Sequence, residues 1–293
     1  MSASATTSAV YSNTNGFPMS NGKNLHMDLG RGDLHNRVIT VGSVQRAEKI
    51  ASFLDSISQK IISSRGFTTI NGLFNDIPVS IVSIGMGVSM MDFFVRESRA
   101  IVDGPMAMVR FGTCGGVSAE ANAGKIVVAS HGSGYIHRNV DYFAYSYSDE
   151  ISRSTLLEPY ITSQISPADE RLSQLVSSEL KKSLNDEDII EGCNVTADSF
   201  YSSQGRIDDN FNDHNHSIID VIKEKYPLAS SMEMETFILL HLAKCSKIQI
   251  KASAAAIVVA NRISGNVIDG NLLDLLEEKG GKAILIAITS VEL

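Results

Sequence analysis

The chain has 293 residues, 43% of them hydrophobic and 6% aromatic, a composition that is typical of a globular protein and excludes a disordered or coiled-coil chain. Its 25 Lys and Arg residues against 33 Asp and Glu residues give a formal net charge of −8. This balance repels polyanions, so we expect no nucleic-acid partner. The length fits a single large α/β domain.

The three cysteines, Cys114, Cys193 and Cys245, are an odd number without a Cys-x-x-Cys pair. They favour neither a disulfide framework nor a thiolate zinc site and indicate a reducing compartment. The N-terminal stretch has no signal-peptide pattern, and no stretch approaches eighteen uninterrupted apolar residues. We therefore expect a cytoplasmic protein with no membrane contact.

Residues 1–22 are polar and without pattern, which predicts a flexible tail before a single domain over residues 23–293. From residue 37 onward, short β-branched runs alternate with helical periodicity. The strands predicted from these runs cover residues 37–42, 79–84, 107–111, 125–129, 189–197 and 248–259. The predicted helices cover residues 47–54, 90–102, 172–184, 235–243 and 272–288, the last with a break at Gly280-Gly281.

Between residues 135 and 169 the periodicity fails, which predicts a long irregular surface segment. The remaining alternation of strands and helices predicts an α/β fold in one domain. Its central sheet is mixed and mostly parallel and is flanked by helices.

Polar residues at strand ends are the candidate functional groups, because open α/β sheets bind ligands there. Gly42 ends a strand, and Arg46 lies in the first turn of the next helix, an arrangement suited to an anion but equally explained by a tight turn and a solvated arginine. Arg110 lies inside an apolar strand, followed by Thr113 in a glycine turn. A buried guanidinium requires either a carboxylate or a bound oxyanion opposite it.

Four motifs occur in a fixed order: residues 85–87 (GMG), 110–116 (RFGTCGG), 199–206 (SFYSSQGR) and 232–236 (MEMET). Together they resemble the nucleoside phosphorylase family, in particular its animal-type uridine phosphorylase branch, from His26 to the C-terminus. The resemblance implies a pentosyltransferase that converts uridine and phosphate reversibly into uracil and ribose 1-phosphate in pyrimidine salvage. Phosphate would be a co-substrate, and no cofactor is implied.

The resemblance also implies where each part of the substrates binds. The phosphate site would contain Gly42, Arg46, Arg110, Thr113 and, from the neighbouring subunit, Arg65. Three guanidinium groups suit a dianion. The expected assembly is a homodimer with shared active sites, or a trimer of such dimers.

The ribose would be held by Glu233, Met234 and Glu235 and by His26 of the partner chain, since a carboxylate can accept two hydroxyl hydrogen bonds. The uracil would be bound by Phe200, Gln204, Arg206 and Arg262. A Gln amide both accepts from N3–H and donates to a carbonyl, and Arg206 would stabilise charge that develops on the base. The residues expected to act in catalysis are Arg110, Glu235 and Arg206.

Two alternatives remain open from sequence. One is a purine nucleoside phosphorylase, although that branch usually has an Asp where this chain has Asn261, followed by Arg262. The other is a catalytically silent, nucleoside-binding relative on the same fold. No metal site is expected, because His214 and His216 lie in an Asn- and Asp-rich stretch that predicts a solvated loop.

Overall fold

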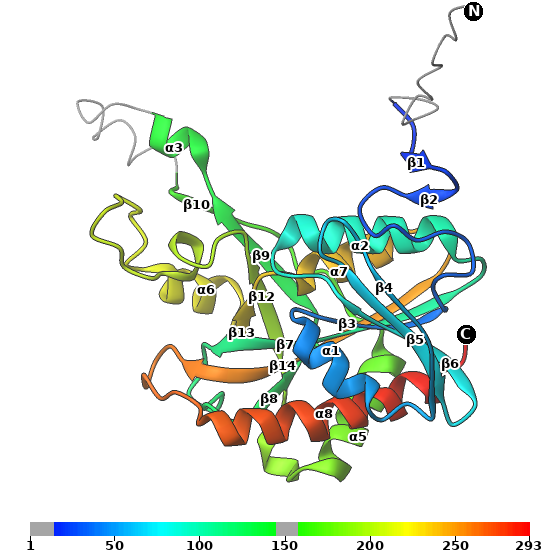
Figure 1. Ribbon diagram of the computed structural model, residues 1–293. Coiled ribbons are helices and arrows are strands. Elements are labelled where there is room, and N and C mark those ends of the chain that lie inside the picture. Colours follow the sequence, from blue (N-terminus) through cyan, green and yellow to red (C-terminus); the bar gives the residue numbers. More distant parts are fainter. Residues whose placement is uncertain (1–14, 145–157) are drawn as a thin grey trace, which may run out of the picture.

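The computed structural model describes residues 15–144 and 158–293 (Figure 1). The expected flexible tail lies outside the described residues as far as residue 14. Residues Met19–Ser20 (β1) pair antiparallel with Lys23–Asn24 (β2). In the described part of the chain, no helix is long and apolar enough to cross a membrane.

One large sheet forms the centre of the molecule, in the order β10-β9-β12-β13-β7-β3-β6-β5-β4. In chain order these strands are β3 (Arg37–Val41), β4 (Ser56–Ile62), β5 (Thr68–Phe74), β6 (Ile77–Ser83), β7 (Met106–Gly116), β9 (Ser133–Arg138), β10 (Tyr160–Thr162), β12 (Cys193–Ala197) and β13 (Ala229–Glu233). Three further strands branch from β7, because β14 (Ile250–Asn261) pairs with β7 and β8 (Ile126–Val128), and β8 pairs with β11 (Ile189–Glu191).

Parallel pairing holds the middle of the sheet, where β7 lies between β3 and β14. The β7–β14 pair is the longest, from Met106 opposite Ile250 to Gly116 opposite Asn261. Antiparallel pairs occur toward the edges, in β4–β5–β6 and β9–β10, and also within the sheet, in β13–β7 and β14–β8. The predicted α/β fold with a mixed sheet flanked by helices is therefore confirmed.

Helices cover both faces of the sheet (Figure 1). On one face lie α1 (Val44–Ala51), α5 (Glu170–Ser183) and α8 (Gly270–Ser290), and on the other lie α2 (Val88–Ile101) and α7 (Thr236–Cys245). Alternate residues of β7 supply the two cores, with Val109 and Phe111 on the α1/α5/α8 side and Met106 and Met108 on the α2/α7 side. Because both faces are covered, these strands are nearly continuously apolar, and that is why they were predictable.

The predicted helix break at Gly280-Gly281 is wrong, since α8 runs unbroken through both glycines. A Cβ at Gly280 would lie 2.7 Å from Cζ of Phe111, and one at Gly281 would lie 2.6 Å from Cγ1 of Ile50. These glycines therefore allow α8 to approach β7 and α1 closely. Their role is packing between elements, which local sequence does not reveal.

Two further predictions need correction. The expected glycine turn after Phe111 is wrong, because β7 continues to Gly116 with β14 beside it. Residues 135–169 are not uniformly irregular, since they contain most of β9, the short helix α3 (Val140–Ala144) and β10. The part of this segment at residues 145–157 lies outside the described residues.

The predicted strand over residues 189–197 is two strands, β11 and β12, separated at Gly192, and they pair with different neighbours, β8 and β9. Strands β4, β5 and β13 were not predicted. Beyond β13, the chain passes into α7, and α6 (Ile218–Lys225) packs near the 3-10 turn η3 (Ser202–Gln204).

Candidate active site

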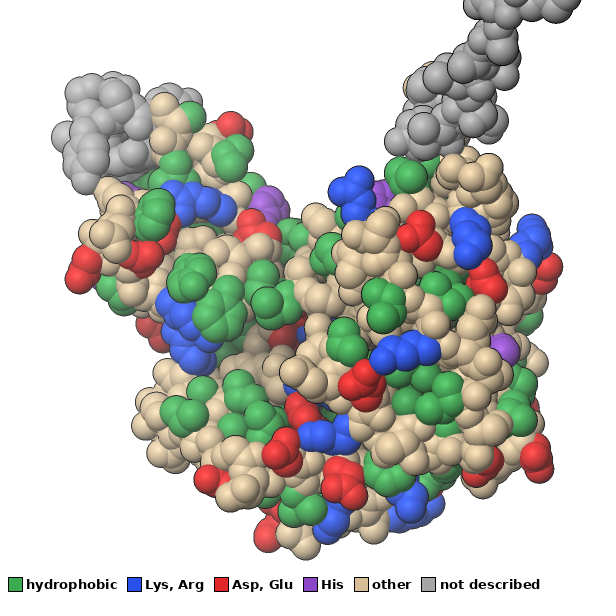
Figure 2. Space-filling view, viewed as in Figure 1, with side chains coloured by type: hydrophobic (Ala, Val, Ile, Leu, Met, Phe, Trp, Pro, Cys, Tyr) green, Lys and Arg blue, Asp and Glu red, His purple; other side chains and the backbone are tan. Residues whose placement is uncertain are grey.

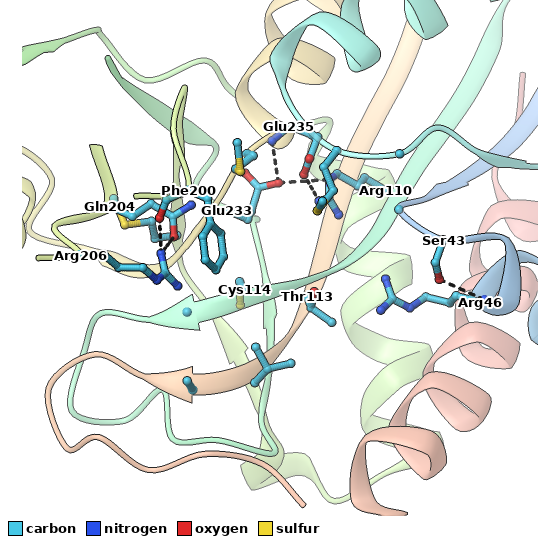
Figure 3. A pocket seen from close by; sticks show the side chains of 18 residues that line it. Ser43, Arg46, Arg110, Thr113, Cys114, Phe200, Gln204, Arg206, Glu233 and Glu235 are labelled. Atoms are coloured by element: carbon cyan, nitrogen blue, oxygen red, sulfur yellow. Dashed lines mark hydrogen bonds and ion pairs between the residues drawn. The ribbon is translucent and has the colours of Figure 1, made fainter. Parts of the chain in front are cut away.

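A cavity of about 400 Å³ opens where several strands end. Its walls come from residues just after β3 and β6 and from the carboxyl-terminal parts of β7, β13 and β14, where open α/β sheets bind ligands. In Figure 2, the surface is hollowed between the lobe that carries α3 and α6 and the rest of the molecule. Ten of the thirteen residues predicted from sequence line the cavity (Figure 3): Gly42, Arg46, Arg110, Thr113, Phe200, Gln204, Arg206, Glu233, Met234 and Glu235.

Arg110 lies in the middle of β7 with its guanidinium over the backbone of Gly112. A Cβ at Gly112 would lie 1.6 Å from Nη1 of Arg110, so only glycine permits this position. Nε of Arg110 lies 3.1 Å from Oε2 of Glu233, and Nη2 donates to Oε2 of Glu235. Two carboxylates, one of the two kinds of partner expected from the sequence, therefore lie beside the Arg110 guanidinium. Burial opposes the positive charge, but Glu235 and Glu233 raise the pKa of Arg110.

Glu233 ends β13, and hydrogen bonds surround its carboxylate. Oε1 accepts from Nδ2 of Asn194 at 2.8 Å and from Oγ1 of Thr196 at 2.6 Å. The backbone N–H of Glu235 donates to Oε2 at 3.0 Å, and that of Thr236 donates to both oxygens. Although burial opposes ionisation, the Arg110 charge and these hydrogen bonds hold the pKa of Glu233 below its ordinary value. Glu233 is therefore an ionised anchor that joins β12, β13 and the start of α7.

Glu235 has fewer contacts and faces the cavity. Its Oε1 accepts from the backbone N–H of Gly87 at 2.6 Å, and its Oε2 accepts from Arg110. Burial raises the pKa of Glu235 above its ordinary value, against the effect of Arg110 and with that of Glu233. Of the two carboxylates, Glu235 has the greater unused capacity to accept hydrogen bonds from a ligand.

The phosphate side of the predicted site begins at the end of β3. Ser43 caps α1, and its hydroxyl accepts from the backbone N–H of Arg46 at 3.3 Å. Arg46 points toward the cavity from the first turn of α1, and Thr113 lies on β7 between Arg46 and the base side (Figure 3). Burial lowers the pKa of Arg46, Glu277 raises it, and Arg110 lowers it, so the two arginines repel each other across this end of the cavity.

The opposite end of the cavity is built by the η3 turn. The guanidinium of Arg206 lies 3.6 Å from the ring centroid of Phe200 and donates to Oε1 of Gln204 at 2.7 Å. Burial, together with the nearby Arg262, lowers the pKa of Arg206 to about 10, which leaves it charged at neutral pH. Arg262 does not line the cavity and instead donates to the backbone oxygen of Gln204 at 2.8 Å. Its bond fixes the turn that carries Gln204.

Most of the chain matches one known protein family. Residues 36–284 match the family model described as the phosphorylase superfamily. The chain belongs to the phosphorylase superfamily. Within it, this phosphorylase is similar to a solved chain from a structural and catalytic study of two uridine phosphorylases of the oomycete Phytophthora capsici, at 40% identity and a TM-score of 0.88. That match covers 97% of this chain and 100% of the other.

Curated relatives carry both pyrimidine and purine names. A guanosine phosphorylase of Halorubrum lacusprofundi is 26% identical, over 92% of this chain and 98% of its own length. A uridine phosphorylase of Haemophilus influenzae is 22% identical, over 91% and 96% respectively. The superfamily is therefore shown by sequence and fold together, and the choice of base has to be argued from the site.

Two predicted residues of this phosphorylase lie away from its own cavity. Arg65 is exposed in the turn between β4 and β5. The ring of His26 stacks on Phe93 of α2 with centroids 3.9 Å apart, and its Nδ1 lies 2.5 Å from Oε1 of Glu97. Neither residue lines the cavity of the same chain.

Sequence reasoning missed several residues of the site. Asn194 and Thr196 hold Glu233, the backbone of Gly87 holds Glu235, and Glu277 holds Arg46. The Gly85-Met-Gly87 motif belongs to the family pattern, but its contact with Glu235 depends on the packing of distant elements. Among the described residues, no group of three or more His, Cys, Asp or Glu side chains could hold a metal ion. Cys114 lines the cavity, and burial raises the pKa of its thiol, which keeps it neutral.

Proposed function

We propose that this phosphorylase catalyses the reversible phosphorolysis of uridine. One oxygen of phosphate bonds to C1′ of the ribose as the bond from C1′ to the base nitrogen breaks. The electron pair of that bond leaves with uracil, which gains the proton that the attacking hydrogen phosphate gives up, and the other product is ribose 1-phosphate. One observation carries the proposal: a single cavity has arginine side chains at both ends and a carboxylate, Glu235, between them. Arg46 and Arg110 lie at one end, and Arg206, next to Gln204, lies at the other.

Each end of the cavity fits one of the charges in this reaction. Arg46, Arg110, Thr113 and the backbone at Gly42 bind the phosphate anion. At the other end, Arg206 and Gln204 donate to the uracil oxygens while negative charge grows on the base, with Phe200 against its face. Phosphate is already anionic near neutral pH, so neither a general base nor a cofactor is required.

The ribose lies between these ends on the Glu-Met-Glu segment. Glu235 accepts hydrogen bonds from the sugar hydroxyls, and Met234 packs on the apolar face of the ring. Glu233 contributes indirectly, because its carboxylate is occupied by Asn194, Thr196 and backbone groups and thereby fixes the position of Glu235. The relation to the Phytophthora capsici chain at 40% identity supports uridine as the nucleoside.

The test is the release of uracil from uridine by the purified protein, measured with and without inorganic phosphate. We expect release only with phosphate and a stoichiometric yield of ribose 1-phosphate. A folded protein that binds uridine without converting it would instead be a silent relative. An Arg110→Ala variant controls for contaminating activity.

A second candidate function is purine nucleoside phosphorolysis, which the similarity to a guanosine phosphorylase over 92% of this chain favours. The base end of the cavity argues for uracil, since it carries the Gln204–Arg206 pair, and the described residues that line this end include no carboxylate for a purine N7. We expect guanosine and inosine to react at less than about 1% of the uridine rate. Comparable rates would assign the chain to the purine branch.

We further propose a homodimer, with or without assembly into a trimer of dimers, in which Arg65 and His26 complete the partner's site. Strand β4 supports an interface near Arg65, because it is an edge strand that exposes Ile57 and Ile62. Arg65→Ala and Arg110→Ala homodimers should each be nearly inactive. A mixed dimer has one site with both arginines, so random co-refolding of equal amounts should restore about a quarter of wild-type activity. Verified mixed dimers without recovery would place Arg65 outside the partner's site.

A further inference from the structure

Arg46 is paired with a carboxylate that is not part of the cavity wall. Its side chain is 9% exposed and contacts Glu277 of α8, which does not line the cavity. Nε of Arg46 donates to Oε1 of Glu277 at 2.9 Å, and Nη2 lies 2.8 Å from the same oxygen. Two contacts to one oxygen fix the plane of the guanidinium and leave its Nη1 side for a ligand.

The second oxygen of Glu277 is occupied by Lys49, which lies one turn further along α1. Nζ of Lys49 lies 2.6 Å from Oε2 of Glu277 and 2.9 Å from Oδ1 of Asp274. Because Lys49 offsets the negative charge of Glu277, the carboxylate can orient Arg46 without cancelling its attraction for an anion. The Glu277 side chain is 12% exposed, so solvent screens these contacts only partly.

Without Glu277, two effects would move Arg46 away from a productive position. A long arginine side chain regains rotamer freedom when its partner is removed, and this entropy must be lost again when the anion binds. Arg46 is also repelled by Arg110 across the cavity. Glu277 counters both effects, since it binds Arg46 at a fixed place and supplies the opposite charge next to it.

We propose that Glu277, with Lys49, is a positioning residue that holds Arg46 in place for phosphate. The inference rests on the proposed phosphorolysis and adds to it a residue outside the cavity, 231 positions along the chain from Arg46. The inference predicts separate kinetic effects for the two substrates. Loss of Glu277 should weaken the use of phosphate and leave the handling of the nucleoside nearly unchanged.

The experiment compares Glu277→Ala, Glu277→Gln and the control Asp274→Ala, which removes only the exposed partner of Lys49. Initial rates are measured with phosphate varied at saturating uridine, and then with uridine varied at saturating phosphate. We expect the phosphate KM to rise about tenfold in Glu277→Ala and about threefold in Glu277→Gln, whose amide oxygen can still accept from Arg46. The uridine KM and kcat should stay within about twofold, and Asp274→Ala should match the wild type.

A double-mutant cycle separates positioning from a direct contact. If Glu277 acts through Arg46, Arg46→Ala and Arg46→Ala/Glu277→Ala should have the same phosphate KM within about twofold. A phosphate KM that is unchanged or lower in both Glu277 variants would overturn the inference, as would a further large loss in the double variant. Thermal unfolding of each variant, with and without phosphate, checks folding and reports phosphate binding without turnover. A wild-type protein that is stabilised by phosphate but cleaves no uridine would refute the proposed function and not this inference.

Discussion

Gly112→Ala is the sharpest test of the way in which β7 presents Arg110. The new Cβ would lie 1.6 Å from Nη1, 2.6 Å from Cζ and 2.9 Å from Nη2 of Arg110. An exposed arginine would swing aside at little cost, but this one is 6% exposed and is held by Glu233 and Glu235. To restore a contact of 3.4 Å, Nη1 must move by roughly 1.8 Å, which breaks the ion pairs.

The displacement has a measurable consequence for catalysis. A shift of more than 1 Å in a group that binds the attacking anion lowers kcat/KM for phosphate by about two powers of ten. Unpairing the buried charges also lowers the free energy of unfolding by about 3 kcal/mol. Uracil release at varied phosphate measures the first effect, and urea unfolding the second. The control is Gly270→Ala, whose Cβ would meet no heavy atom within 4 Å. Near wild-type kcat/KM for phosphate in folded Gly112→Ala would refute the proposed position of Arg110.

Three further predictions test other parts of the structure. Arg206→Ala should lower kcat/KM for uridine by about 100-fold with little change in melting temperature, and a folded variant with near-normal activity would remove Arg206 from the uracil site. Burial raises the pKa of Glu235 above 4.5, so kcat/KM should fall when the pH decreases through that raised value and the carboxylate is protonated. Glu235→Gln should be less active, and its pH profile should lack this loss of activity at low pH. Gly280→Ala places a Cβ 2.7 Å from Phe111 and should cost about 1–3 kcal/mol in urea unfolding, whereas unchanged stability would show that the core yields there.

Many helices and strands could be predicted from the sequence, because the spacing of hydrophobic residues indicates which side chains are buried. Side chains of β7 point alternately into two hydrophobic cores, which is why the strand is apolar at nearly every position. The apolar residues at helical spacing over residues 172–184 correspond to α5. Strand β5 was missed because polar residues and a glycine, Thr68, Thr69, Asn71 and Gly72, interrupt its apolar pattern although the strand is buried. Strand β4 was missed because of its exposure. Strand β4 is exposed along most of its length, so its residues carry no burial pattern, and its pairing with β5 defines it.

The sequence by itself determined the α/β class, the superfamily motifs and ten residues that line one cavity. Only the tertiary structure decided which partners those residues have. Arg110 meets Glu235 from 125 positions away, and Arg46 meets Glu277 from 231 positions away. A buried arginine requires some anion, and that requirement is visible in the sequence around it. Which carboxylate satisfies it depends on how distant elements pack, and for that reason neither these ion pairs nor the close approach of α8 at Gly280 could be predicted from local pattern.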